Sequence, residues 1–129
     1  QGRETNVPEQ RFRFRTPPLR NVAATGPWMH DGAYTSLDAA VRHHLDCRGA
    51  LENYDPTQLK PELQSTFRDQ PIQLQRILSS IDPWCDTAPR LSDGEVDALL
   101  AFLGALTDPA VFDLPALVPD AVPSGRRPR

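Results

Sequence analysis

The chain has 129 residues and a formal net charge of −3, with 39% hydrophobic and 24% charged residues. This composition fits one globular domain with a modest core and excludes a largely disordered chain. The acidic balance argues against a nucleic-acid surface, which needs a basic excess, and no apolar run reaches the roughly 18–20 residues that span a bilayer. Fourteen prolines predict short elements joined by extended loops.

The N-terminal segment, residues 1–11, is polar, and we expect it to be frayed. The chain starts at Gln1, with no initiator methionine and no signal peptide, which indicates a processed or cut product. The next residues read RFRFRT, and this alternation predicts a short extended segment with Phe12 and Phe14 on one side. Arginines and aromatics together also bind single-stranded nucleic acid, but the acidic chain gives that alternative little support.

A turn follows at Gly26-Pro27, and the whole stretch from Thr25 to Asp46 reads TGPWMHDGAYTSLDAAVRHHLD. Its Gly/Pro-rich first half presents Met29 and His30 on irregular backbone, where binding residues tend to lie. Each of these two also has a plainer interpretation. Met29 fills a gap between hydrophobic side chains, and His30 is a turn residue bonded to the backbone.

The second half of this stretch predicts a helix that is capped by Thr35 or Ser36, with Asp38 in its first turn. At about 100° per residue, one face carries Leu37, Ala40, Val41, His44 and Leu45. This periodicity directs His44 inward and His43 sideways or outward. A buried neutral imidazole is a strong ligand for iron or zinc. The alternative interpretation of His44 is a core histidine that forms hydrogen bonds and binds no metal.

Residues 48–70 are predicted to form a surface loop with one helical turn at 61–64. A second helix begins at Pro71, because proline suits a first helical position, and Asp82-Pro83 ends it. Its expected apolar face consists of Ile72, Leu74, Ile77, Leu78 and Ile81. Trp84 and Cys85 then lie in a connector.

The clearest helix covers residues 93–106, where Ser92 and Glu95 have the spacing of a capping box. Its apolar face consists of Val96, Leu99, Leu100, Leu103 and Leu106. The tail from 110 to 123, which includes Phe112, is expected to lie against the body of the domain. Residues 126–129 are basic and expected to be disordered.

The two cysteines, Cys47 and Cys85, are far apart in sequence and form no CxxC motif, which argues against a zinc or thioredoxin-like site. A disulfide between them would stabilise the fold by about 3–4 kcal/mol on the chain-entropy model. Two unpaired thiols are the alternative, and the sequence leaves both open. No G-x-S-x-G motif, phosphate loop or carboxylate cluster supports another chemistry.

One long stretch of the chain, FRTPPLRNVAATGPWMHDGAYTSLDAAVRHHLD, closely resembles the C-terminal haem domain of the bacterial di-haem cytochrome c peroxidase/MauG family. LSDGEVDALLAFLGALTDP resembles the closing helix of that family. The resemblance covers about residues 12–125. It implies an all-α, cytochrome c-like domain, of which this chain is the C-terminal part, with long Pro-rich loops.

In that family haem c is attached through CxxCH motifs, and this chain has none. The resemblance therefore implies that the haem is attached outside this chain and that the chain alone is inactive. It places the distal axial ligand of the electron-transfer haem iron on His44. Trp28, Met29 and His30 would lie at the haem edge or domain interface, and the main-chain carbonyls of Thr25 and Pro27 would bind a calcium ion.

The implied activity is that of a periplasmic oxidoreductase, a peroxidase that reduces hydrogen peroxide with electrons from a small redox protein. MauG-like oxidation of a protein substrate is one alternative, and a haem-free helical interaction module is another, which the missing CxxCH favours. The implied partners are the N-terminal haem-bearing part and either the electron donor or the protein substrate. A homodimer is left open.

Overall fold

The computed structural model describes residues 14–68 and 70–113, and the regular secondary structure of these residues is helical apart from one isolated backbone pairing. The α-helices are α1 (Leu37–Leu45), α2 (Cys47–Glu52), α3 (Pro61–Gln64), α4 (Pro71–Ser80) and α5 (Asp93–Ala105). Short 3-10 turns join them: η2 (Val22–Ala24), η3 (Pro56–Gln58), η4 (Pro83–Thr87) and η5 (Pro109–Phe112). The all-α prediction is confirmed. The terminal segments 1–11 and 126–129 lie outside the described residues.

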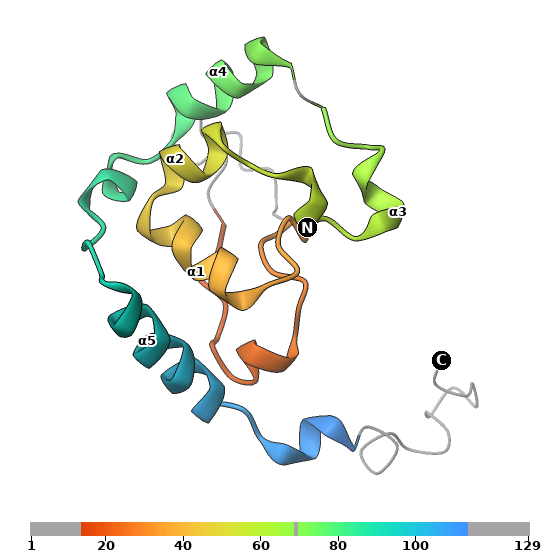
Figure 1. Cartoon of the computed structure of the whole chain (residues 1–129), viewed down its shortest axis with the longest axis vertical. Helices are drawn as coiled ribbons and strands as arrows, with labels where there is room; N and C mark the ends of the chain where they lie inside the picture. Colours follow the sequence, from red (N-terminus) through yellow and green to blue (C-terminus); the bar gives the residue numbers. More distant parts are fainter. Residues whose placement is uncertain (1–13, 69, 114–129) are drawn as a thin grey trace.

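The core lies where α1 packs against α5, and in Figure 1 α3 lies on the far side of α1 from α5. Val41 of α1 meets Val96 and Leu103 of α5, and Val96 is only 1% exposed. The predicted apolar face of residues 93–106 is therefore confirmed. At the other end of α5, the Asn21 amide donates to the Leu106 carbonyl at 3.1 Å, so the segment before the Gly26-Pro27 turn is joined to α5.

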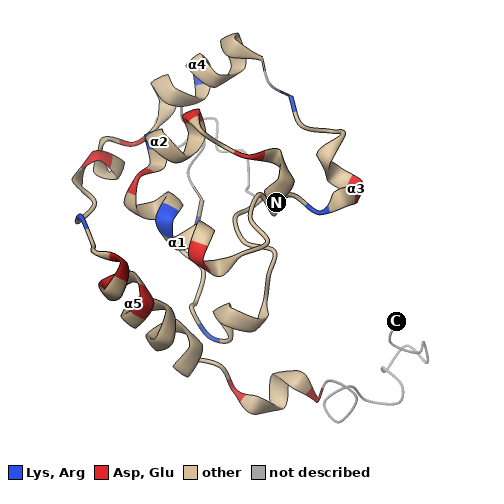
Figure 2. Ribbon diagram, viewed as in Figure 1, with Lys and Arg blue, Asp and Glu red and all other residues tan. Residues whose placement is uncertain are grey.

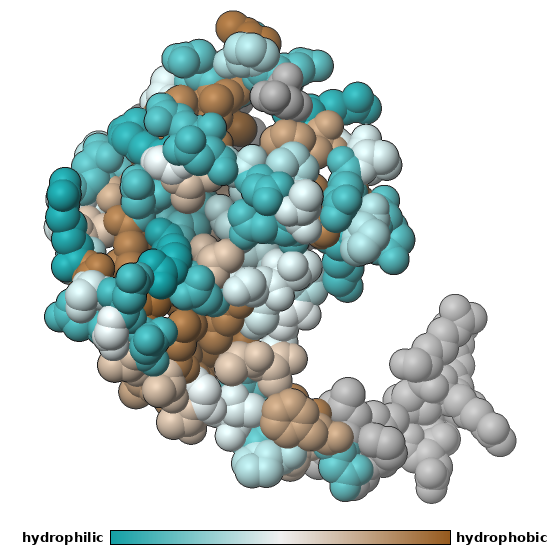
Figure 3. All heavy atoms as spheres, in the orientation of Figure 1, coloured by the Kyte–Doolittle hydropathy of each residue, from teal (hydrophilic) through white to brown (hydrophobic). Residues whose placement is uncertain are grey.

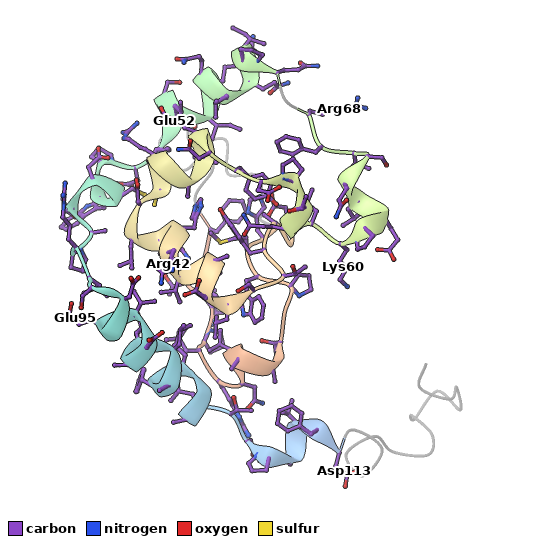
Figure 4. All side chains as sticks on the ribbon, viewed as in Figure 1. Arg42, Glu52, Lys60, Arg68, Glu95 and Asp113 are labelled. Atoms are coloured by element: carbon purple, nitrogen blue, oxygen red, sulfur yellow. The ribbon has the colours of Figure 1, made fainter. Side chains whose placement is uncertain are left out.

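Charged side chains reinforce the contact between α1 and α5. Arg42 forms an ion pair with Asp38 one turn earlier on α1, at 3.0 Å. It forms a second with Asp93 in the first turn of α5, at 2.9 Å. Figure 2 shows the acidic start of α5, and Figure 4 labels Arg42 on α1 and Glu95 on α5. These exposed pairs add little stability by themselves, but they orient the two helices.

The helix starts follow the sequence signals. Ser36 caps α1 through a bond from the Ala39 amide at 3.4 Å. The capping box of α5 is present, because the Ser92 amide donates to the Glu95 carboxylate at 2.8 Å. The helical turn at Pro61–Gln64 and the start of α4 at Pro71 also match the prediction.

The prediction of a loop directly after residue 47 is wrong, because α2 runs from Cys47 to Glu52 and η3 follows it. The Asp46 carboxylate accepts a hydrogen bond from the Gly49 amide at 2.9 Å and so caps α2. Tertiary packing then holds this short helix, which lies against α1, α4 and η4. Likewise, the connector around Trp84 and Cys85 is the 3-10 turn η4.

Two predicted apolar contacts are only partly made. On α4, Ile72 is 61% exposed and Ile77 47% exposed, whereas Leu74 and Leu78 are half-buried. Phe112 is 76% exposed, so the expectation that the tail packs against the body is wrong at this residue; residues 114–123 lie outside the described part.

Figure 3 shows hydrophobic side chains gathered over α5 on the visible face. Within the described ranges, no helix combines the length and hydropathy needed to cross a membrane.

Candidate functional site

The turn that follows η2 is closed by its own backbone. The Trp28 amide donates to the Tyr34 carbonyl at 2.8 Å, and the Tyr34 amide donates back to the Trp28 carbonyl at 3.4 Å. The Trp28 indole donates to the Val22 carbonyl at 2.8 Å, which fastens the turn to η2. Met29 and Gly32 both adopt left-handed φ of 70° inside it. The predicted irregular turn is thus a defined loop, residues 28–34, held at both ends.

Tyr34 connects this loop to α1. It is the most buried aromatic residue of the described chain, at 4% exposure, and its hydroxyl lies 3.0 Å from Nδ1 of His43. Burial, followed by the charges of Asp31 and Cys47, raises the pKa of Tyr34. Burial, followed by neighbouring His44, lowers the pKa of His43. The phenol therefore keeps its proton and the imidazole is neutral, so the contact is a hydrogen bond between two neutral groups.

The predicted orientation of the two adjacent histidines is wrong, because His43 is half-buried against Tyr34 and His44 is exposed. The cause is the direction in which α1 packs. Its contact with the core is centred on Val41 and uses Leu37 and Leu45, so His44 lies at the edge of the buried stripe. In the part of the chain that the structure describes, no hydrogen bond engages the His44 ring.

The rings around Tyr34 form a continuous row. His44 and His43 meet edge to face with centroids 5.8 Å apart, and His43 lies 5.4 Å from Tyr34. Tyr34 meets Tyr54 at 5.5 Å, and Tyr54 meets Phe67 at the same separation. The Tyr54 hydroxyl donates to the Ala33 carbonyl, which fixes the loop from a second side. This row, His44-His43-Tyr34-Tyr54-Phe67, passes from the exposed His44 through the buried Tyr34 to Phe67, which is 37% exposed.

The remaining predicted site residues lie in or beside the same loop. His30 is exposed and stacks on Phe14, with centroids 4.3 Å apart. Met29 is half-buried. Thr25 and Pro27 are exposed in the preceding turn. The loop is therefore joined to α1 through Tyr34 and His43, and no bond described here joins His30 or Met29 to His44.

A site for a small metal ion built from side chains alone is not found among residues 14–68 and 70–113, because no group of three or more His, Cys, Asp or Glu is gathered there. What α1 offers is an exposed imidazole, His44, beside a half-buried one, His43, that is hydrogen-bonded to Tyr34. Sequence periodicity marked the two histidines but missed the bond between His43 and Tyr34. Only the folded loop brings these two rings together.

Comparison with known proteins identifies similar sequences but no family model and no solved structure. The methylamine utilization protein MauG of Paracoccus denitrificans is 36% identical over 101 residues, which are 78% of this chain and 24% of that protein. MauG of Methylorubrum extorquens is 30% identical over 113 residues, 87% of this chain and 24% of that protein. The cytochrome-c peroxidase IdrP1 of a Pseudomonas species is 34% identical over 98 residues, 75% of this chain and 25% of that protein.

Together, the helical fold and these matches define a cytochrome c-like domain. The chain belongs to the di-haem family of MauG and cytochrome-c peroxidases and matches the C-terminal part of its members. It spans about a quarter of the length of these relatives.

Proposed function

We propose that this chain is the C-terminal part of a periplasmic di-haem oxidoreductase that reduces hydrogen peroxide with electrons from a small redox protein. Relatives named cytochrome-c peroxidase support the reaction class. The single structural observation that carries the proposal is the exposed imidazole of His44 on α1. In this proposal, residues 12–125 belong to the haem domain, and the haem c is attached by CxxCH motifs outside this chain.

The donor set of the site fits a haem better than a bare metal ion. A haem already carries four equatorial nitrogens and needs one protein ligand on each face, so one imidazole from this chain suffices. His44 is the candidate for the distal face, because its ring is exposed and unbonded within the described residues. When bound, the haem would supply one-electron redox chemistry.

His43 has a different role in this proposal. Its Nδ1 is hydrogen-bonded to the Tyr34 hydroxyl and its ring is half-buried, so it is less accessible to iron than the exposed ring of His44. Instead, the bond holds the last turn of α1 against the loop at residues 28–34. Because His44 directly follows His43 in the chain, the same bond restricts the movement of His44.

The loop would contribute the surroundings of the haem. Trp28, Met29 and His30 are proposed to line the haem edge or the interface with the N-terminal part. Thr25 and Pro27 are exposed residues, and their main-chain carbonyls are proposed to bind calcium, because carbonyl oxygens suit this hard ion. Other ligands for that ion would come from the rest of the protein or from water.

The test uses adjacent histidines as a matched pair in the full-length protein. His44→Ala should abolish the six-coordinate low-spin signal of one haem in optical and electron paramagnetic resonance spectra. His43→Ala should retain that signal, because its ring bonds Tyr34 rather than iron. If His44→Ala leaves both haem spectra unchanged, His44 is not a ligand. If the full-length protein contains no haem, the haem-free interaction module is the better description.

A ligand swap gives an independent readout. Methionine raises the potential of a haem relative to bis-histidine ligation. His44→Met should therefore raise the midpoint potential of one haem and leave that of the other unchanged. A potential that stays the same for both haems contradicts the assignment.

MauG-like oxidation of a protein substrate is the second candidate reaction, and the 36% identity to MauG of Paracoccus denitrificans favours it. The two reactions differ in the source of the electrons. Peroxide consumption that requires a reduced donor protein supports the peroxidase. Peroxide-dependent oxidation of side chains on a partner protein, without an added donor, supports the MauG-like reaction.

A further inference from the structure

The fold brings together two cysteines that are far apart in sequence. Cys47 is the first residue of α2 and is 8% exposed, whereas Cys85 lies in the middle of η4 and is half-buried. Both line the same pocket of ≈ 660 Å³, and the elements that carry them, α2 and η4, pack against each other. Both are free thiols in this structure.

The residues that follow the two cysteines hold them in place. Arg48 forms a two-pronged pair with Asp86, with Nε to Oδ1 at 2.7 Å and the second nitrogen to Oδ2 at 3.2 Å. The third guanidinium nitrogen donates to the Leu78 carbonyl at 3.2 Å. Two parallel bonds fix the orientation of both partners as well as their separation. The pair therefore holds η4 against α2, with Cys47 and Cys85 lining the same pocket.

We infer that Cys47 and Cys85 form a disulfide when the protein meets a disulfide donor, such as an oxidised thiol–disulfide oxidoreductase or oxidised glutathione. The bond links α2 to η4, which already pack against each other and place both cysteines in one pocket. It does not depend on haem or on the reaction proposed above.

The exchange proceeds in two balanced steps. The more exposed thiol, Cys85, loses its proton and attacks the donor disulfide, which gives a mixed disulfide and one donor thiolate. Cys47 then loses its proton and attacks Sγ of Cys85, which releases the second donor thiolate. Overall, the two cysteines lose two protons and two electrons, and the donor disulfide is reduced to two thiols.

This order follows from the environment of Cys47. Burial, followed by the hydrogen bond and the charge of Cys85, raises the pKa of Cys47 to about 12. Cys47 is therefore a poor first nucleophile. Once Cys85 is part of a mixed disulfide, both contributions from Cys85 to the pKa of Cys47 disappear, and burial and the nearby charge of Asp46 are the causes that still oppose its ionisation.

The bond would enclose a loop of about 40 residues that contains α3 and α4. Since Cys47 directly follows the Asp46 cap, the bond would also fix α2 immediately beyond the histidines of α1.

The test uses the full-length protein after incubation with oxidised glutathione. Free thiols are blocked with N-ethylmaleimide under denaturing conditions, and peptides are mapped by mass spectrometry with and without reductant. A Cys47 peptide joined to a Cys85 peptide, seen only without reductant, supports the inference. Three outcomes overturn it: both thiols blocked, glutathione retained on one cysteine, or a link between two copies of the chain.

Thermal denaturation provides a second readout with matched variants. The oxidised protein should melt on the order of 10 °C above the reduced protein. Cys85→Ser and the double variant with Cys47→Ser should lose this dependence on reductant. Cys85→Ser is the better single variant because its position is less buried. If the variants retain the dependence on reductant, these cysteines do not cause it.

Discussion

The bond between Tyr34 and His43 can be tested by a double-mutant cycle. Tyr34→Phe keeps the ring, which is 4% exposed and packs edge-on against Tyr54, and removes only the hydroxyl. The loss of this 3.0 Å hydrogen bond should lower the free energy of unfolding by about 1 kcal/mol. His43→Phe removes the hydrogen-bond partner of the buried Tyr34 hydroxyl, which should lower the free energy of unfolding by roughly 1–3 kcal/mol.

The double variant should be less destabilised than the sum of the two single variants. Neither unpaired group remains once both are replaced by rings of similar shape, so the coupling energy should be about 1–2 kcal/mol. Urea denaturation of the four full-length proteins under identical conditions measures it. If the destabilisation of the double variant equals the sum for the two single variants within about 0.3 kcal/mol, the hydrogen bond is not a stabilising contact.

Three further perturbations test the fold. Leu103→Ala opens a cavity in the small core and should lower the free energy of unfolding by about 3 kcal/mol in urea. Gly49→Ala should destabilise by about 1 kcal/mol, because a Cβ there would meet the Asp46 carboxylate that caps α2; a stabilised variant, as helix propensity alone implies, would contradict the cap. The bonds from the Ser92 amide and hydroxyl lower the pKa of Glu95 from 4.5, so this contribution to stability is present above pH 4.5 and is lost as the pH falls through the lowered value. Glu95→Gln should remove that pH dependence in thermal melts, and a variant that melts like the wild type down to pH 3 would contradict it.

The helices that were predicted correctly are those with local signals. The capping box at Ser92 and the leucine repeat behind it define α5 to within one residue of its end. Pro71 marks the start of α4 in the same way. These signals act between residues three or four apart, so the sequence itself contains them.

α2 was missed because its stability comes from elsewhere in the chain. Cys47–Glu52 has no apolar period and contains Gly49, which normally disfavours a helix. Its cap at Asp46 and its packing against α1, α4 and η4 compensate for this. Contacts of this kind become visible only when the fold is known.

The histidines of the candidate site show the same limit of prediction from sequence. Periodicity gives the angle of each side chain around α1 but not which neighbours cover it. Val41 sets the buried direction, Tyr34 covers His43, and His44 is left exposed. The identity of the residues involved could be predicted, whereas their partners could not.

Asp46 is the single residue between α1 and α2, and it ends one helix and begins the other. Its backbone amide bonds to the Arg42 carbonyl, and its carboxylate bonds to the Gly49 amide. Because Asp46 is bonded to both helices, the connection between α1 and α2 has little freedom to bend. A rotation of α2 would therefore also move His43 and His44 at the end of α1. A displacement of η4, which packs against α2, would thus be transmitted to the end of α1 that carries His43 and His44.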